Sequence, residues 1–379
     1  MRAVVFTETG ACDVLRLVDR DAAEPGAGEV RVRVLRSGVN PTDWKVRQGA
    51  TGQGMAFPEI VPNQDGAGVV DAVGEGVRRL HPGDRVWVIL AAHQRPTGTA
   101  QELAVLPEER VFPLPDTASY DLGASLGVPA VTAHRALTTS EDGPRRLGPG
   151  TLENTTVLVQ GGAGAVGNAA IQLAAWAGAT VITTVSSDTK ATLARAAGAH
   201  HVVDYTTGDT AAAIRECAPE GVDIVVEVAP AQNVGLDLSV IRSRGTIAIY
   251  ANNGGDEVPL SVRQTFSTNV RMQFVYLYLV GAEALENAAE DVTAAVREGA
   301  LAVGEEHGLP LHHFPLERTA EAHASVEDGA VAFDVWIDVA GAVTAWPTAS
   351  ATKRTDVPRP AASGHTSRAH RISTPDRHM

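Results

Sequence analysis

The residues best suited to chemistry form a glycine-rich turn at 161–167, composed of Gly161, Gly162, Ala163, Gly164, Ala165, Val166 and Gly167. The run satisfies the pattern G-x-G-x-x-G, follows a β-branched stretch and opens an alanine-rich one. Glycines allow the backbone to approach a pyrophosphate closely, and its charge then lies at the N-terminus of the following helix. The pattern predicts a dinucleotide-binding turn. A plain strand-to-helix turn is the competing interpretation.

A second set of polar residues follows about twenty positions later, where the next expected strand ends. An NAD enzyme usually carries an acidic residue there, which binds the ribose 2′-hydroxyl. This chain has Ser186 and Ser187, and then Lys190. Two hydroxyls and a lysine suit a 2′-phosphate and favour NADPH over NADH. In the alternative interpretation Asp188 binds the ribose and Lys190 is a solvated helix residue. Tyr205 either flanks the same phosphate or adenosine, or is an ordinary packing residue.

The elements that must position these residues alternate between strand and helix. Strands are expected at 156–160, 180–185, 201–205, 223–228 and 246–250, with helices at 165–177, 189–197 and 210–218. Strands that alternate with helices of this length indicate a parallel, doubly wound Rossmann sheet.

The rest of the chain has a different character. Its first 115 or so residues carry short β-type runs at 30–35, 66–73 and 86–90 without helical crossovers, which indicates a mostly antiparallel, barrel-like unit. Residues 124–137 read as a helix of small residues interrupted by Pro129. Helices near 284–298 and 320–326 and a strand near 333–339 are expected to pack back onto the first domain. The predicted boundaries are therefore 1–124, 125–279, 280–340 and a disordered tail at 341–379.

Composition restricts the class of protein. The 379 residues are 44% hydrophobic and 20% charged, as in globular proteins. No apolar run approaches the roughly 20 residues of a membrane span, and the first residues resemble a strand rather than a signal peptide. Cys12 and Cys217 lie far apart without metal-ligand spacing, which favours a reducing cytoplasm. The net charge of −14 argues against a nucleic-acid partner.

Several separated motifs, in order, give a family resemblance. They are GVNPTDWK at 38–45, DGAGVV at 65–70, PGDRV at 82–86, the glycine turn, AAGA at 196–199 and FPLE at 314–317. From Met1 to about Val339 the chain resembles the quinone oxidoreductase (zeta-crystallin-like) branch of the medium-chain dehydrogenase/reductase superfamily. The resemblance implies an α/β fold in which a GroES-like, mostly antiparallel β domain accompanies the Rossmann domain. It further implies an active site between the two domains and a homodimer.

The resemblance also bears on zinc. Zinc-dependent members of the superfamily bind their catalytic metal through a cysteine in the first motif and a Gly-His-Glu triplet in the second. Here those places read Asn40 to Asp43 and Asn63-Gln64-Asp65, without a thiolate or an imidazole. We therefore expect no metal site.

By the same resemblance, Asn40 and Asp43 lie at the mouth of the cleft. Lys45 occupies a position where relatives contact cofactor or substrate; it is the candidate to hydrogen-bond a carbonyl or to supply a proton, and a surface lysine is the alternative. Thr132 matches a position near the nicotinamide. Relatives carry a Gly-Lys pair near the end of the chain, where this chain has Phe333-Asp334.

Together these features predict a zinc-free oxidoreductase that transfers a hydride from NADPH to a quinone or an α,β-unsaturated carbonyl. One alternative is an enoyl-thioester reductase of a biosynthetic pathway, and another is an NADPH-binding protein with little turnover. Four aromatic residues favour an apolar or aromatic acceptor or, equally, a dimer interface: Phe266, Phe274, Tyr276 and Tyr278.

Overall fold

The computed structural model describes residues 1–379 apart from 51, 53, 330–334 and 340–379. The chain divides into two compact units, Met1–Gly341 and Ala342–Met379, and the described residues all belong to the first. The predicted disordered tail and the Phe333-Asp334 pair lie outside the described residues. Within the described part, no helix is long and apolar enough to cross a membrane.

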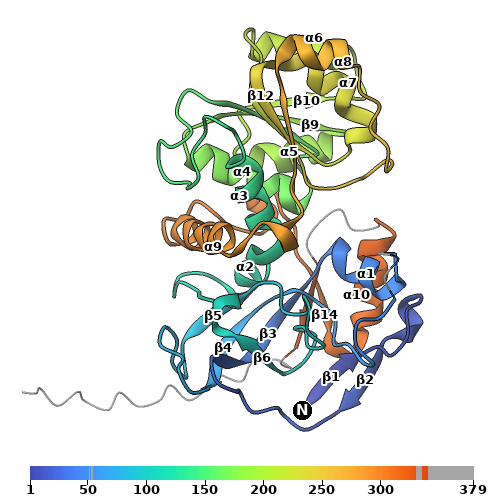
Figure 1. Ribbon diagram of the computed structural model, residues 1–379, viewed down its shortest axis with the longest axis vertical. Helices are drawn as coiled ribbons and strands as arrows, with labels where there is room; N and C mark the ends of the chain where they lie inside the picture. Colours follow the sequence, from blue (N-terminus) through green and yellow to red (C-terminus); the bar gives the residue numbers. More distant parts are fainter. Residues whose placement is uncertain (51, 53, 330–334, 340–379) are drawn as a thin grey trace, which may run out of the picture. The chain divides into compact units, whose positions relative to one another are not determined.

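A six-stranded parallel sheet forms the Rossmann part of the fold (Figure 1). Its strands lie in the order β10-β9-β8-β11-β12-β13, and every neighbouring pair is parallel. This is the doubly wound order expected for a dinucleotide-binding sheet. The strands are β8 (Thr156–Gln160), β9 (Thr180–Val185), β10 (His201–Asp204), β11 (Val222–Glu227), β12 (Ile241–Ile249) and β13 (Arg271–Phe274).

Both faces of this sheet are buried, because alternate residues of its strands enter different cores. In β8, Val157 and Val159 belong to one hydrophobic cluster and Leu158 to another. The first cluster includes residues of α3, α4, α5 and α9, and the second includes residues of α6 and α7. Two covered faces explain why the strands read as continuous apolar runs. The helices are α4 (Ala165–Trp176), α5 (Asp188–Ala196), α6 (Thr210–Cys217), α7 (Pro230–Val240), α8 (Val262–Thr268) and α9 (Ala282–Arg297).

A seven-stranded sheet forms the second part, in the order β14-β15-β3-β4-β5-β7 with β6 also paired to β3. The β14–β15 pair is parallel and the others are antiparallel. The period-two pattern predicted near residue 30 is present, since Val30, Val32 and Val34 are buried in one core. The strands are β3 (Glu29–Val39), β4 (Asp65–Val73), β5 (Arg85–Val88), β6 (Leu103–Pro107), β7 (Val111–Pro113), β14 (His312–Pro315) and β15 (Val335–Asp338), with β1 (Arg2–Val5) and β2 (Arg16–Asp19) as a separate antiparallel pair.

Sequence-distant segments meet in this part of the fold. β15 pairs with β3, while α10 (Thr319–Glu327) contacts α1 (Pro41–Gln48). By contrast, α9 places Ala288, Val292 and Ala295 in the cluster that contains α3 and α4. The combination of a parallel Rossmann sheet and a mostly antiparallel β domain is as predicted.

The helix expected at 124–137 is divided into three pieces. They are α2 (Tyr120–Ala124), a π-helical turn (Leu126–Ala130) and α3 (Val131–Leu137). Pro129 lies inside the π turn, where its missing N–H and its ring prevent a regular α-helical hydrogen bond.

Candidate functional site

The glycine turn connects β8 to α4. Gly161 has φ +69°, a left-handed conformation that favours glycine, and Gly164 is the N-cap residue immediately before α4. A Cβ atom on Gly167 would lie 2.5 Å from the carbonyl oxygen of Gly161, so only glycine allows the helix to pack this closely. A Cβ on Gly164 would meet that same oxygen at 3.6 Å, an ordinary contact. The uncapped first turn of α4 therefore presents its N–H groups at an open position.

At the end of β9 the predicted 2′-phosphate residues lie together. The Ser187 hydroxyl accepts a hydrogen bond from the Lys190 N–H at 3.3 Å and caps α5. The Lys190 ammonium reaches back and donates to the Ser186 hydroxyl at 3.0 Å. Tyr205 follows β10, and its N–H donates to the carbonyl of Val185 at 3.0 Å, while its side chain is exposed. The structure thus brings these four residues to one edge of the sheet.

A buried hydrogen-bond chain that the sequence did not reveal lies beneath the glycine turn. The Gly161 N–H donates to the Thr184 hydroxyl at 3.4 Å, and this hydroxyl donates to Gln160 Oε1 at 2.5 Å. Gln160 Nε2 donates in turn to Asp237 Oδ1 at 2.8 Å. Because Gln160 is an amide, it relays both contacts with one side chain.

This hydrogen-bond chain ends at two fully buried carboxyl groups, those of Asp237 and Glu227. Burial and the neighbouring Glu227 carboxylate raise the pKa of Asp237 well above its usual value. Glu227 Oε1 also accepts from the N–H of Ala229 and from Asn233 Nδ2, the latter at 3.1 Å. Glu227 therefore fixes the turn between β11 and α7.

The start of α1 holds the predicted catalytic residues Asn40 and Asp43. The Asn40 N–H donates to Asp43 Oδ2 at 2.7 Å, as in a capping box. Asn40 Nδ2 donates to Asp65 Oδ2 at 2.8 Å, and the same oxygen accepts from the Val128 N–H at 2.8 Å. Asp65 therefore connects α1 to the π turn before α3.

Asp43 is buried, and its surroundings decide its charge. Burial raises its pKa to about 7, although hydrogen bonds from the backbones of Asn40 and Gln64 oppose the rise. A carboxyl group with such a pKa exchanges its proton near neutral pH. This is the pKa range that suits a general acid or base.

Two contacts link α1 to the Rossmann part. The Thr42 hydroxyl lies 2.8 Å from the Tyr278 hydroxyl. The Lys45 ammonium approaches Asn252 Oδ1 at 3.5 Å, the outer limit of a hydrogen bond, so it is held only loosely. Thr132, the predicted nicotinamide neighbour, is buried in α3.

The Tyr278 ring belongs to an aromatic group. Its centroid lies 4.8 Å from the His93 ring and 5.1 Å from the Tyr276 ring. Burial, followed by the Asp43 carboxylate, raises the pKa of Tyr278 so that it stays protonated. Of the four aromatic residues that the sequence singled out, Tyr278 contacts α1, whereas Phe266 and Phe274 are 80% and 64% exposed. The sequence singled out Tyr278 as an aromatic residue and did not predict its contact with Thr42.

Comparison with known proteins places this geometry in a family. The alcohol dehydrogenase GroES-like domain model matches residues 26–116, and the zinc-binding dehydrogenase model matches residues 165–294. The quinone oxidoreductase of Rattus norvegicus is 30% identical over 330 residues, which cover 86% of this chain and 94% of the relative. The chain belongs to the quinone oxidoreductase branch of the medium-chain dehydrogenase/reductase superfamily.

Solved structures agree with this family. A mycobacterial protein solved in complex with NADPH has 29% identity and a TM-score of 0.74, covering 89% of this chain and 99% of that one. A structure described as an NAD-dependent alcohol dehydrogenase has 30% identity and a TM-score of 0.77, covering 90% and 100%. The predicted family and fold class are confirmed.

The positions that bind zinc elsewhere in the superfamily carry other contacts here. Asn63 has φ 77°, a conformation that asparagine tolerates better than most residues, and its side chain donates to Ser37 and lies 2.9 Å from the His323 ring nitrogen. Gln64 accepts from the Ala92 N–H. Among the residues that the structure describes, no three His, Cys, Asp or Glu side chains are arranged to bind a metal.

Proposed function

We propose that this protein is an NADPH-dependent oxidoreductase that delivers a hydride to a quinone or to an α,β-unsaturated carbonyl. The observation that carries the proposal is the glycine turn of β8 and α4, accompanied at the end of β9 by the hydrogen-bonded Lys190 and Ser186. The turn accommodates a pyrophosphate, and the cation with its hydroxyl partner matches the additional phosphate that distinguishes NADPH from NADH.

The residues present fit the cofactor. Gly164 leaves an open cradle at the N-terminus of α4, and Ser186, Ser187 and Lys190 would hold the 2′-phosphate beside the exposed Tyr205. When bound, NADPH supplies the hydride from its nicotinamide ring. The NADPH complex of the mycobacterial relative supports this choice, whereas the NAD-dependent relative supports the alternative in which Asp188 binds the ribose.

The residues at the start of α1 would bind and orient the acceptor. Asn40 is fixed by Asp65, and the Tyr278 hydroxyl is a protonated donor beside Thr42. Lys45, held loosely by Asn252, can turn to donate a hydrogen bond or a proton to a carbonyl oxygen. The aromatic rings of Tyr276, Tyr278 and His93 favour a flat, apolar acceptor.

We also propose that the reaction needs no zinc. The side chains at the metal positions are amides and carboxylates that are already committed to internal hydrogen bonds, as in Asn40, Asn63 and Asp65. Catalytic zinc sites in proteins usually combine histidine, cysteine and carboxylate ligands. Activation of the acceptor would then depend on hydrogen bonds and on orientation.

A panel of acceptors tests this function. We expect NADPH oxidation with quinones or enones, at rates that a metal chelator leaves unchanged. Preferential oxidation with enoyl thioesters would support the alternative of an enoyl-thioester reductase. Tight NADPH binding without turnover on any acceptor would overturn the proposed activity and support a binding protein.

A homodimer is a further part of this proposal. β13 is the outer strand of the Rossmann sheet, and six of the exposed large apolar residues lie in it or in the segments that flank it in sequence: Leu260, Val262, Phe266, Phe274, Tyr276 and Leu279. An open strand edge beside exposed apolar side chains is a typical interface. Sedimentation should show a dimer, and Phe274→Glu should convert it to a monomer.

Cys12 and Cys217 form no disulfide, which is consistent with a cytoplasmic location.

A further inference from the structure

A cavity of about 620 Å³ lies where the end of α3, the following loop, β13 and the start of α9 meet. None of its lining residues belongs to the glycine turn, to the end of β9 or to the start of α1. Three arginines line it, namely Arg135, Arg145 and Arg271, together with two carboxylates, Glu141 and Glu283. The cavity is therefore separate from the site described above.

The hydrogen bonds of the three arginines go to groups other than carboxylates. Arg135 donates to the Thr138 hydroxyl at 3.1 Å, and Arg271 donates to the Thr139 carbonyl at 3.4 Å. Within the described ranges, none of the three forms an ion pair. Although the chain has a net charge of −14, these three arginines concentrate positive charge around one cavity.

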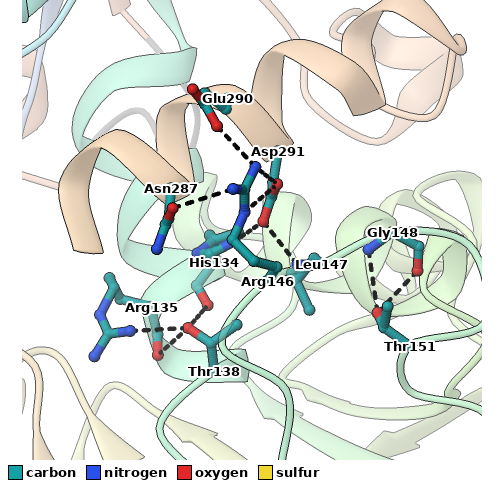
Figure 2. A network of polar contacts seen from close by, with 10 residues as sticks. All are labelled: His134, Arg135, Thr138, Arg146, Leu147, Gly148, Thr151, Asn287, Glu290 and Asp291. Carbon is teal, nitrogen blue, oxygen red and sulfur yellow. Dashed lines mark hydrogen bonds and ion pairs between the residues drawn. The ribbon is translucent and has the colours of Figure 1, made fainter. Parts of the chain in front are cut away.

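The neighbouring Arg146 shows the contrast. It donates to Asp291, Asn287 and Glu290 on α9, and Figure 2 shows its guanidinium directed into this group of acceptors. In the same view, Arg135 reaches only Thr138 at the end of its own helix. Arg146 thus fixes the loop onto α9. The guanidinium of Arg135 makes one hydrogen bond, to Thr138, within the described structure.

Desolvation increases the need for an anion at this cavity. Arg135 is partly buried, and this burial lowers its pKa. Its Nε and the hydroxyl of Ser140 are both enclosed without a hydrogen-bond partner within the described structure. A buried cation or donor without a partner costs free energy that a bound acceptor would recover. The start of α9 adds to this, since no side chain caps it after Gly281.

We propose that this cavity binds a phosphate group, either as inorganic phosphate or as part of a small phosphate ester. A phosphate dianion offers several acceptor oxygens, and arginine guanidinium groups bind such oxygens in pairs. Arg135 and Arg145 approach from the α3 side and the loop, and Arg271 approaches from β13. The two carboxylates in the lining, Glu141 and Glu283, limit the net positive charge, which favours a compact anion over a polyanionic surface.

Calorimetric titration of the full-length protein with inorganic phosphate at constant ionic strength tests the proposal. Glycerol phosphate is titrated in a second series, and the comparison shows whether the cavity prefers a phosphate ester or the free ion. Binding of either one supports the site. Arg135→Gln/Arg145→Gln should weaken phosphate binding at least tenfold. Arg145→Gln alone, at an exposed position, should weaken it measurably even if the double variant folds poorly.

Two controls make the result decisive. Arg244→Gln removes a nearby positive charge that is already paired with Asp142, so it should leave phosphate binding unchanged. Titration of the protein saturated with NADPH, which fills the phosphate site proposed at Lys190, should show the same phosphate binding. Equal loss in Arg244→Gln, abolition of phosphate binding by saturating NADPH, or no binding by the unmodified protein would overturn the proposal.

Discussion

The ammonium of Lys190 lies 3.0 Å from the hydroxyl of Ser186, across the first turn of α5. The contact places a cation and a hydroxyl beside each other at the end of the second Rossmann strand. At this position a carboxylate would select NADH and a cation selects NADPH. Because the Ser186 hydroxyl accepts a hydrogen bond from the ammonium, the lysine side chain is oriented toward the site.

Replacement of Lys190 should therefore change the cofactor preference. Lys190→Ala removes a charged hydrogen bond, which contributes about 1.5–3 kcal/mol, so NADPH should bind roughly 10- to 100-fold more weakly. Affinity for NADH should change little. Fluorescence titration with both cofactors measures this. Asp188→Asn is the matched control, and a loss of NADH or NADPH binding only in this variant would favour the alternative in which Asp188 binds the ribose.

Substitutions at two glycines of the turn, Gly164 and Gly167, should have separate effects on cofactor binding and on stability. Gly167→Ala places a Cβ 2.5 Å from the Gly161 carbonyl oxygen, so we expect a loss of about 1–3 kcal/mol in the free energy of unfolding. Gly164→Ala meets its nearest atom at 3.6 Å and should fold normally, yet bind NADPH weakly because the methyl group enters the cofactor cradle. Denaturant unfolding and NADPH titration of both variants check this. Normal NADPH binding by Gly164→Ala would contradict the proposed cradle.

The sequence predicted the fold well where the signal was local. Strand–turn–helix alternation and the glycine spacing both operate over a few residues, and so does the contact between Ser186 and Lys190. The chain from Gln160 to Asp237 and the pair formed by Thr42 and Tyr278 join residues 77 and 236 positions apart. No local pattern identifies such partners, because they depend on how separate elements pack.

The division of the expected helix at 124–137 has a local cause, since Pro129 was visible in the sequence. The contact that follows from it could not be predicted, because the N–H of Val128 in the π turn donates to Asp65 of β4, 63 positions away in the sequence.

Asp43 should make the stability of the protein depend on pH. Its pKa is about 7 in the folded state and near 3.8 when unfolded, so the folded protein binds the extra proton between these values. The contribution of Asp43 to the free energy of unfolding is therefore largest below pH 4 and falls as the pH rises to 7. Asp43→Asn should lose this dependence while its side-chain oxygen still accepts from Asn40. Urea unfolding of both proteins at pH 5 and pH 8 tests it, and parallel pH dependence would contradict the assignment.

The buried pair of Asp237 and Glu227 should also make the free energy of unfolding fall as the pH rises, as Asp43 does. Since the pKa of Asp237 is raised, its ionisation destabilises the folded protein as the pH rises. Asp237→Asn should thus be at least as stable as the unmodified protein at pH 9. Asp237→Leu leaves Gln160 Nε2 without its acceptor and should cost about 1–3 kcal/mol at every pH. If Asp237→Asn were as destabilised as Asp237→Leu at pH 9, the raised pKa of Asp237 would be contradicted.

The most direct test of the proposed function is the oxidation of NADPH that carries deuterium at the transferred position of C4. Absorbance at 340 nm is followed in a single turnover with a quinone and with an enone, after treatment with a metal chelator. We predict acceptor-dependent oxidation that is slower with the deuterated cofactor and, for the enone, deuterium on a carbon of the product. NADPH that binds but is not oxidised by any acceptor, or an activity that the chelator abolishes, would contradict zinc-independent hydride transfer.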